Sequence, residues 1–346
     1  MTIENTPFKT RARTIDHLGR EQIADCPTAI SELWKNSYDA YSRAVELNIF
    51  SASENALPVA ALVDDGHGMS KEEFIDKWLV VGTESKALKN DTPDSDRNGL
   101  AARPRQGQKG IGRLSCAAMG SLLLLVSKRE TKPFVASLID WRIFENPYLI
   151  LNDIELPVIE FDSKNDLLNY LPEMFEALMC NIWGTNDEKS RDRDLRIKTA
   201  WQAYDAFEES IGRPSTRSDI ENTIIESSFE TKHFEKWAVW NNRSSHGTAL
   251  FISKISDDLL SQLSSESSSN DDSANAASRS KFFETLSGFI DPYTKANDPF
   301  VVTNFTAQVN VWQGNLLRVI LDKTSEFNAR DLDQLEHFVE GIVDST

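Results

Sequence analysis

The spacing of apolar side chains along the chain predicts helices and strands in mixed order. Residues 28–49 carry the longest helical period, because at 100° per residue one side of the helix collects mostly apolar positions. Asp25 and Pro27 stand just before this stretch, where an N-cap and a first-turn proline belong. We therefore predict a long helix over 28–49. Its apolar side consists of Ile30, Leu33, Trp34, Ser37, Tyr41 and Ala44.

Short apolar runs elsewhere indicate strands, and periodic charged stretches indicate further helices. Mixed elements in this order favour an α+β fold, a two-layer α/β sandwich with helices packed on a sheet. The predicted strands lie at 57–63, 121–127, 133–140, 147–156, 247–255, near 300–304 and over 307–322. The further predicted helices lie at 71–82, at 281–289 and from Ala329 to Val343.

Changes in composition divide the chain into three parts. The first predicted domain spans 1–255, and a mostly helical, charged stretch of it, about 157–245, has the character of an insertion. Residues 264–280 are rich in Ser, Asn and Asp and cannot bury much surface, so they predict a loop. This loop and the closing elements of the first domain occupy 256–305, and a short C-terminal α/β segment follows over 306–346.

Composition excludes several classes of protein. A chain of 346 residues with 40% hydrophobic content is long enough for a real core. It has no apolar run of 18 residues and no apolar leader, so we expect no membrane contact and a cytoplasmic location. Three scattered cysteines suit a reducing compartment, and neither they nor the five histidines have zinc-ligand spacing. A net charge of −17 argues against broad, nonspecific binding to a nucleic-acid backbone.

Glu32, Asn36 and Asp39 form the first group with candidate chemistry. Their positions on the predicted helix fall within about 60° of one another, opposite the apolar side. A carboxylate beside a carboxamide suits general-base activation of water and coordination of a hard cation such as Mg²⁺. Such residues are also ordinary on a solvated helix face, and this group alone favours that simpler interpretation.

The second group is the segment DDGHGM at 64–69. A strand that ends in Asp64 and continues through Gly66 and Gly68 lets the backbone turn closely around a planar ligand. The Asp64 carboxylate could accept a hydrogen bond from an exocyclic amine such as that of adenine. A strand followed by an ordinary glycine turn is the alternative.

The third group is GQKGIG at 107–112. Its glycines lead into a helix start, whose free N–H groups would face an anion, and Lys109 and Arg113 add positive charge. A flexible hinge is an equally good interpretation of this segment alone. The order of the three groups, followed by Gly247 and Thr248 in a predicted strand, is far more specific than any one of them.

This order resembles the GHKL ATPase superfamily, which includes gyrase B subunits, a class of heat-shock chaperones, MutL-type mismatch-repair proteins, MORC proteins and sensor histidine kinases. The resemblance covers most of residues 15–255 and implies the Bergerat ATP-binding fold with ATP and Mg²⁺ as ligands. It implies that Glu32 is the catalytic base and Asn36 the Mg²⁺ ligand. The nucleotide-binding residues that it implies are Asn36, Asp39, Ala40, Asp64, Gly66, Gly68, Met69, Lys86, Gly107, Lys109, Gly110, Ile111, Gly112 and Thr248.

Within these implied sites each segment has a role. Asp64 would bind the adenine amine with support from Thr248, while Gly66, Gly68 and Met69 shape the pocket. The amides of 107–112 would hold the β- and γ-phosphates. The polar run of about 86–106 would be a lid over the nucleotide, and Lys86 could reach a phosphate.

The motifs favour the hydrolase branches over the sensor kinases. Asp39 and Ala40 stand where kinases usually carry a basic residue, and too few residues precede the motif for a dimerisation hairpin. We expect an ATPase that closes its lid and dimerises, as in MORC, MutL or chaperone-like clamps, in DNA transactions or bacterial defence. The alternative is a nucleotide-gated scaffold or binding module that does not hydrolyse ATP and works within a larger complex.

The resemblance also implies partners. ATP and ADP are the expected small molecules, and a nucleotide-dependent homodimer or a partner protein is expected to complete the assembly. Nucleic acid would be contacted through another region or a partner, because the chain is acidic overall. Residues 306–346 resemble the start of a transducer-like segment, with Arg318 and Lys323 as candidate γ-phosphate contacts, and the chain is expected to be truncated or one component of a complex.

Overall fold

An eight-stranded mixed sheet organises the part of the chain that the computed structural model describes, namely residues 8–52, 56–81, 92–103, 105–106, 112–185, 187–263, 280–286 and 305–323. The strand order is β5-β4-β3-β6-β2-β1-β7-β8. All described pairs are antiparallel except β1 with β7. The strands are β1 (Ala44–Phe50), β2 (Val59–Asp64), β3 (Gly120–Lys128), β4 (Phe134–Asp140), β5 (Val158–Phe161), β6 (Gly247–Ile255), β7 (Thr306–Gln313) and β8 (Leu316–Lys323).

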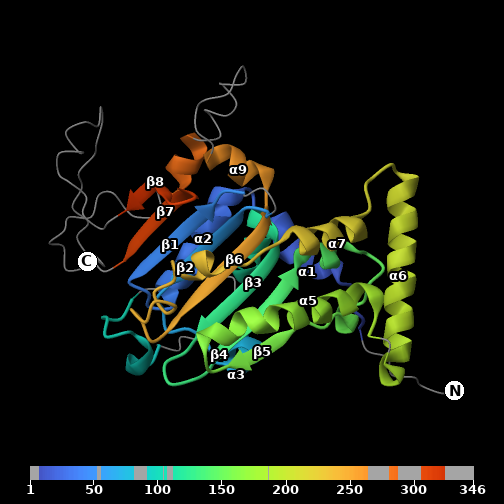
Figure 1. Cartoon of the computed structure of the whole chain (residues 1–346), viewed down its shortest axis with the longest axis horizontal. Coiled ribbons are helices and arrows are strands. Elements are labelled where there is room, and N and C mark those ends of the chain that lie inside the picture. The colour runs from blue at the N-terminus through green and yellow to red at the C-terminus, as the bar shows by residue number, and fades with distance from the viewer. Residues whose placement is uncertain are drawn as a thin grey trace, which may run out of the picture.

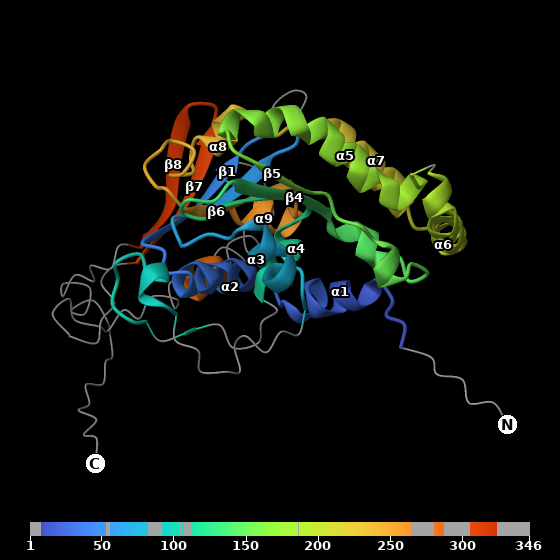
Figure 2. The same cartoon turned by 90° about the horizontal axis from the view of Figure 1, so that it is seen from below.

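Helices cover both faces of this sheet. Figure 2 shows α1 and α2 on one side and α5 and α7 on the other, and Figure 1 shows α6 at the end of the molecule opposite β8. Because both faces are covered, every residue of β2 and of β4 is buried, and most of these residues are apolar. The helices are α1 (Arg13–Leu18), α2 (Cys26–Asp39), α3 (Lys71–Glu73), α4 (Cys116–Met119), α5 (Leu167–Trp183), α6 (Arg191–Ser210), α7 (Thr216–Glu226), α8 (Thr231–Phe234) and α9 (Asp257–Leu263). These elements confirm the predicted α+β fold, but helices α5 and α7 of the predicted insertion cover a second face of the sheet, which the predicted two-layer sandwich did not include.

The predicted helix over 28–49 is right in its first half and wrong in its second. The Asp25 side chain accepts a hydrogen bond from the Thr28 amide at 2.9 Å, which confirms the N-cap. The helix then ends at Asp39, and Tyr41 has a left-handed backbone with φ of 57°. Residues 44–50 alternate in period two, and they gain backbone hydrogen bonds on both sides as β1, from β2 and from β7. Sheet pairing thus overrides the helical spacing.

The predicted strand over 147–156 is also wrong. Residues 151–153 form a turn of 3₁₀ helix, and one isolated bridge joins Ile150 to Arg11. The Asn146 side chain accepts from the Tyr148 amide at 2.9 Å, which turns the backbone away from an extended path. The edge strand β5 begins only at Val158.

Most other predicted elements are confirmed where the structure describes them. Strands at 57–63, 121–127, 133–140 and 247–255 correspond to β2, β3, β4 and β6, and 307–322 forms the hairpin of β7 and β8. The predicted helix at 71–82 is α3 followed by a π-helical turn over Phe74–Trp78, and residues 280–286 are helical. The predicted strand near 300–304, the loop at 264–279 and the helix from Ala329 to Val343 lie outside the described residues.

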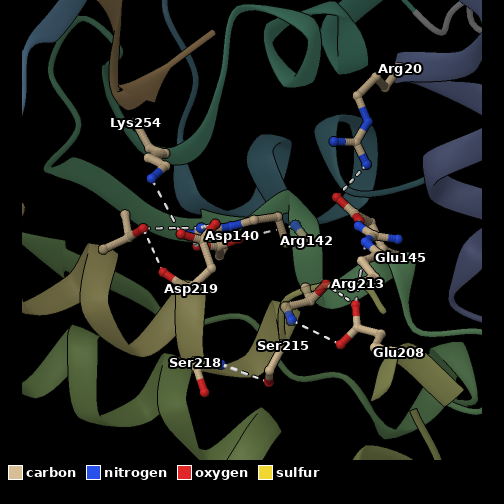
Figure 3. A network of polar contacts seen from close by, with 12 residues as sticks. Arg20, Asp140, Arg142, Glu145, Glu208, Arg213, Ser215, Ser218, Asp219 and Lys254 are labelled. Atoms are coloured by element: carbon tan, nitrogen blue, oxygen red, sulfur yellow. Dashed lines mark hydrogen bonds and ion pairs between the residues drawn. The ribbon is translucent and has the colours of Figure 1, made fainter. Parts of the chain in front are cut away.

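A network of ion pairs joins helices of the predicted insertion to the sheet (Figure 3). Arg142, directly after β4, donates to the buried Asp140 at 2.5 Å and to Asp219 of α7 at 2.6 Å. Lys254 of β6 also donates to Asp219, at 3.3 Å. A second arm of the network contains Arg20, Glu145, Arg213 and Glu208. Removing one partner of such a buried pair leaves an uncompensated charge, so the network fixes α7 on the sheet.

Candidate functional site

A pocket opens between α2 and the strands β2 and β6, close to the π-helical turn that follows α3. It brings together predicted site residues from three separate segments of the chain. These are Asn36 and Ala40 from α2, Asp64, Gly68 and Met69 from the turn after β2, and Thr248 from β6. Residues that are far apart in the sequence therefore meet here as the motif order predicts.

Asp64 lies at the inner end of the pocket and is held from three directions. Its Oδ2 accepts from the Ser37 hydroxyl at 2.8 Å, and its Oδ1 accepts from the amides of Gly66 at 2.9 Å and Thr248 at 3.1 Å. Burial raises the pKa of this carboxyl to about 6, against the effect of these donors. Oδ2 receives one hydrogen bond and retains capacity for another, so it can accept from a ligand.

The turn after β2 needs glycine at two positions, because its backbone lies very close to neighbouring segments of the chain. Gly68 has φ of +65°, and a Cβ there would lie 2.0 Å from the carbonyl oxygen of Lys128. A Cβ on Gly66 would lie 2.9 Å from both Cβ and O of Ala40. The turn therefore lies directly against the end of α2 and against β3. Any larger residue at these positions would displace the pocket wall.

Two histidines that are not among the predicted site residues contact carbonyl oxygens of the same turn. Nδ1 of His67 is 2.7 Å from the Gly68 oxygen, and Nδ1 of His246 is 2.7 Å from the Gly66 oxygen. Since a carbonyl only accepts, each Nδ1 carries the proton and donates it. Burial lowers the pKa of His67, which favours its neutral form.

Thr248 is tied to the turn through a serine. The Ser127 hydroxyl lies 2.9 Å from Thr248 Oγ1, and it also accepts from the Met69 amide at 2.9 Å. The Trp237 indole donates to the Asp64 carbonyl at 3.0 Å and fixes the end of β2. These bonds join β2, β3 and β6 at the pocket, so they hold Asp64 and Thr248 in fixed positions relative to one another.

Glu32 and Asn36 lie together on α2 beneath Gly112. A Cβ on Gly112 would lie 3.2 Å from Glu32 Oε2 and 3.5 Å from Asn36 Nδ2. The absence of a side chain at 112 therefore leaves these two groups accessible. Among the described residues, Glu32 Oε1 accepts from Lys35 Nζ at 2.6 Å. The Asn36 side chain makes no hydrogen bond within that part of the chain.

Four described residues of the predicted set do not line the pocket, namely Glu32, Asp39, Gly66 and Gly112. Oδ1 of Asp39 accepts from the Gln106 amide at 2.9 Å. Asp39 thus anchors the residue directly before the glycine segment of 107–112. Five predicted residues, Lys86, Gly107, Lys109, Gly110 and Ile111, lie outside the described residues, and their contacts with phosphate stay a prediction.

Several pocket residues were missed by sequence reasoning. Leu33, Ser37, Leu62, His67, Lys77, Trp78 and Leu250 also line the pocket, as does Arg113, which the sequence singled out only for its charge. Ser37 could have been identified from the sequence, because it is the one serine on the predicted apolar side of the helix. Arg113 donates to the carbonyls of Lys77 and Val80, and so it connects the end of the glycine segment to the π-helical turn. That contact depends on folding and has no sequence signal.

The donor set fits a magnesium ion held largely by its ligand. The described residues contain no group of three or more His, Cys, Asp or Glu side chains that could hold a metal. Mg²⁺ prefers oxygen ligands and usually keeps waters and substrate phosphates in its shell. The amide oxygen of Asn36, accessible beneath Gly112, suits the role of its protein ligand.

A buried acid at a strand end, a glycine turn against it and a carboxylate–amide helix beneath a second glycine define an ATP-binding domain of the GHKL class. Residues 25–166 match the family described as histidine kinase-, DNA gyrase B- and HSP90-like ATPase. The match confirms the resemblance drawn from the motifs. Thr248 lies beyond the matched segment, and the structure brings it to the site.

Two further findings bear on the class of protein. No curated protein matched the chain. None of the helices in the described ranges combines the length and the apolar character needed to cross a bilayer.

Proposed function

We propose that the chain binds ATP with Mg²⁺ and hydrolyses it, and that nucleotide binding closes a lid and dimerises two chains into a clamp. The observation that carries this proposal is that Asp64 and Asn36 line one pocket, and that Glu32 lies beside Asn36 on α2, next to Gly112. A nucleotide spans these groups with its base on Asp64 and its phosphates near α2. The family includes kinases as well as ATPases, so hydrolysis rests on Glu32.

In the proposed mechanism the chain's own groups position the reactants. Asp64 accepts a hydrogen bond from the adenine amine, and Thr248 supports this contact. The Asn36 amide oxygen would hold Mg²⁺, and the ion would supply positive charge to neutralise the phosphate oxygens. Glu32 orients a water against the γ-phosphorus and accepts its proton as the bond to the ADP oxygen breaks. Catalysis of this kind depends on positioning and on fixed charge rather than on a covalent intermediate.

Arg103 supplies an anchor for the proposed lid of about 86–106. Its guanidinium lies 4.7 Å from the Tyr38 ring centre and donates to the Ser42 carbonyl at 2.7 Å. Burial lowers the pKa of Arg103. This contact fixes one end of the lid to the end of α2, next to the pocket, so closure over the nucleotide would move the residues before it.

The proposed clamp couples the reaction to a change in assembly. MORC, MutL and chaperone-like ATPases couple lid closure to association of two chains, and we propose the same coupling here. DNA transactions or bacterial defence are the processes that we propose for it. Its support is the motif order, together with the lid anchor at Arg103.

A nucleotide-gated scaffold without turnover is the second candidate. The observation that favours it is the ion pair of Glu32 with Lys35, in which the proposed base already has a cationic partner. Single-turnover hydrolysis by purified protein, with native mass measured with and without a non-hydrolysable ATP analogue, separates the two. Release of phosphate and a doubled mass are expected. Binding without any release would favour the scaffold.

Adenosine affinity is expected to fall as pH drops through about 6. The adenine amine needs an unprotonated acceptor, and protonation of Asp64, with its pKa raised to about 6, removes one. Below that pH the affinity should fall by about tenfold per pH unit, and above pH 7 it should be constant. Calorimetry between pH 5 and 8 checks this, with adenosine chosen because it carries no phosphate to titrate. Constant affinity across this range would contradict the assignment.

A further inference from the structure

Lys35 is a cation within the proposed catalytic face of α2 that no motif assigns. Its Nζ lies 2.6 Å from Glu32 Oε1, one turn earlier on the helix. The two side chains are 31% and 30% exposed, so both are open to a ligand. An ion pair with this exposure is weak, because water screens it, and it can exchange its partner readily.

The ion pair places this ammonium beside the proposed base, with Lys35 Nζ 2.6 Å from Glu32 Oε1. A water activated by Glu32 must lie within hydrogen-bond reach of its carboxylate, and reacting atoms in a productive complex are about 3–3.5 Å apart. Because the lysine stem is long and flexible, a γ-phosphate bound next to that water would lie within reach of the ammonium without movement of the helix.

Two other cations, Lys77 and Arg113, line the pocket, but neither contacts Glu32. Arg113 donates to the carbonyls of Lys77 and Val80, and Lys77 Nζ donates to Glu73 Oε1 at 2.9 Å.

Arg318, a candidate from the sequence, lies on β8 at the outer edge of the described sheet and donates to the Leu263 carbonyl at the end of α9. The side chain of Lys323 lies outside the described residues. Within the described ranges, Lys35 is the cation that contacts the proposed base.

We propose that Lys35 is a γ-phosphate sensor and catalytic residue, which pairs with Glu32 in the free chain and moves to the γ-phosphate when ATP binds. This inference rests on the proposed function. The move does two things. It places a positive charge where negative charge develops on the phosphoryl oxygens, and it releases Glu32 to accept a proton from water, a step that a paired ammonium opposes. Lys35 stays protonated throughout and forms no covalent bond.

The test compares ATP and ADP on Lys35→Met and Lys35→Arg. Loss of one preorganised donor to a developing oxyanion lowers kcat by about 10²-fold in well-studied cases, and we expect a loss of that order in Lys35→Met. ATP affinity should fall about tenfold, while ADP affinity should stay within about twofold, since ADP lacks the γ-phosphate. Lys35→Arg, which keeps the charge, should recover part of both losses.

Lys232→Met is the matched control. Lys232 also pairs with a glutamate, Glu230, at 3.1 Å and is exposed, but it lies on α8 and not on α2. Wild-type affinities and turnover are expected from it. Unchanged or faster hydrolysis by Lys35→Met overturns the inference, as does an equal loss of ATP and ADP affinity. If the wild-type chain binds no nucleotide, the proposed function itself is wrong. If the wild-type chain binds and hydrolyses ATP and only the result for Lys35→Met differs from expectation, the proposed function stands and the inference about Lys35 is wrong.

Discussion

The Glu32→Ala protein is expected to bind ATP with nearly the wild-type affinity and to hydrolyse it at least about 10³-fold more slowly. Glu32 is the carboxylate that lies next to Gly112 and outside the pocket lining, and its removal takes away the proposed base without touching Asp64. An interaction made only in the transition state changes turnover and leaves ground-state binding intact. Equilibrium calorimetry and phosphate release measure the two quantities separately.

Glu32→Gln provides the matched control for this prediction. It keeps the shape of the side chain and a partner for Lys35, but it cannot accept a proton from water. It should be as inactive as Glu32→Ala. Turnover by Glu32→Gln near the wild-type rate would show that another group acts as base.

Asp64→Asn is expected to abolish ATP binding, with an affinity at least about 100-fold lower. The carboxylate already accepts from Ser37, Gly66 and Thr248, and the adenine amine is the fourth donor. An amide presents an NH₂ group in place of one oxygen, so two donors would face each other in a buried site. Calorimetry with ATP measures the loss, and circular dichroism checks the fold.

Asp65→Asn is the control one residue away. The Asp65 carboxylate accepts from the Ser42 hydroxyl and from the amides of Arg43 and Ala44, and it does not line the pocket. The variant should lose some stability and retain its affinity for ATP. Wild-type affinity in Asp64→Asn would remove the adenine assignment altogether.

The site was predictable where a motif forces a backbone shape. Gly66 and Gly68 mark a turn that other residues cannot adopt, and Asp64 follows directly from its place at the strand end. The contacts of Ser127 and Trp237 were not predictable, because their partners are distant in sequence and lie close only after the strands pair. A single sequence shows local geometry well and tertiary contacts poorly.

The errors in the fold have a similar cause. Residues 44–50 fit a helical period and a strand period equally well, and the decision depends on β7, which lies far along the chain. The strand predicted over 147–156 failed because Asn146 bonds to the backbone two residues on.

The parallel pairing of β1 with β7 has a consequence for biosynthesis. Asn48 of β1 accepts side-chain hydrogen bonds from Asn310 and Trp312 of β7, and the first of these partners comes 262 positions later in the chain. At about 5–20 residues per second, a ribosome needs about 13–50 s to deliver it. During that interval one edge of β1 lacks its neighbour and can template aggregation. Recombinant versions that stop before residue 313 should therefore precipitate, and slower, cooler expression should favour those that include it.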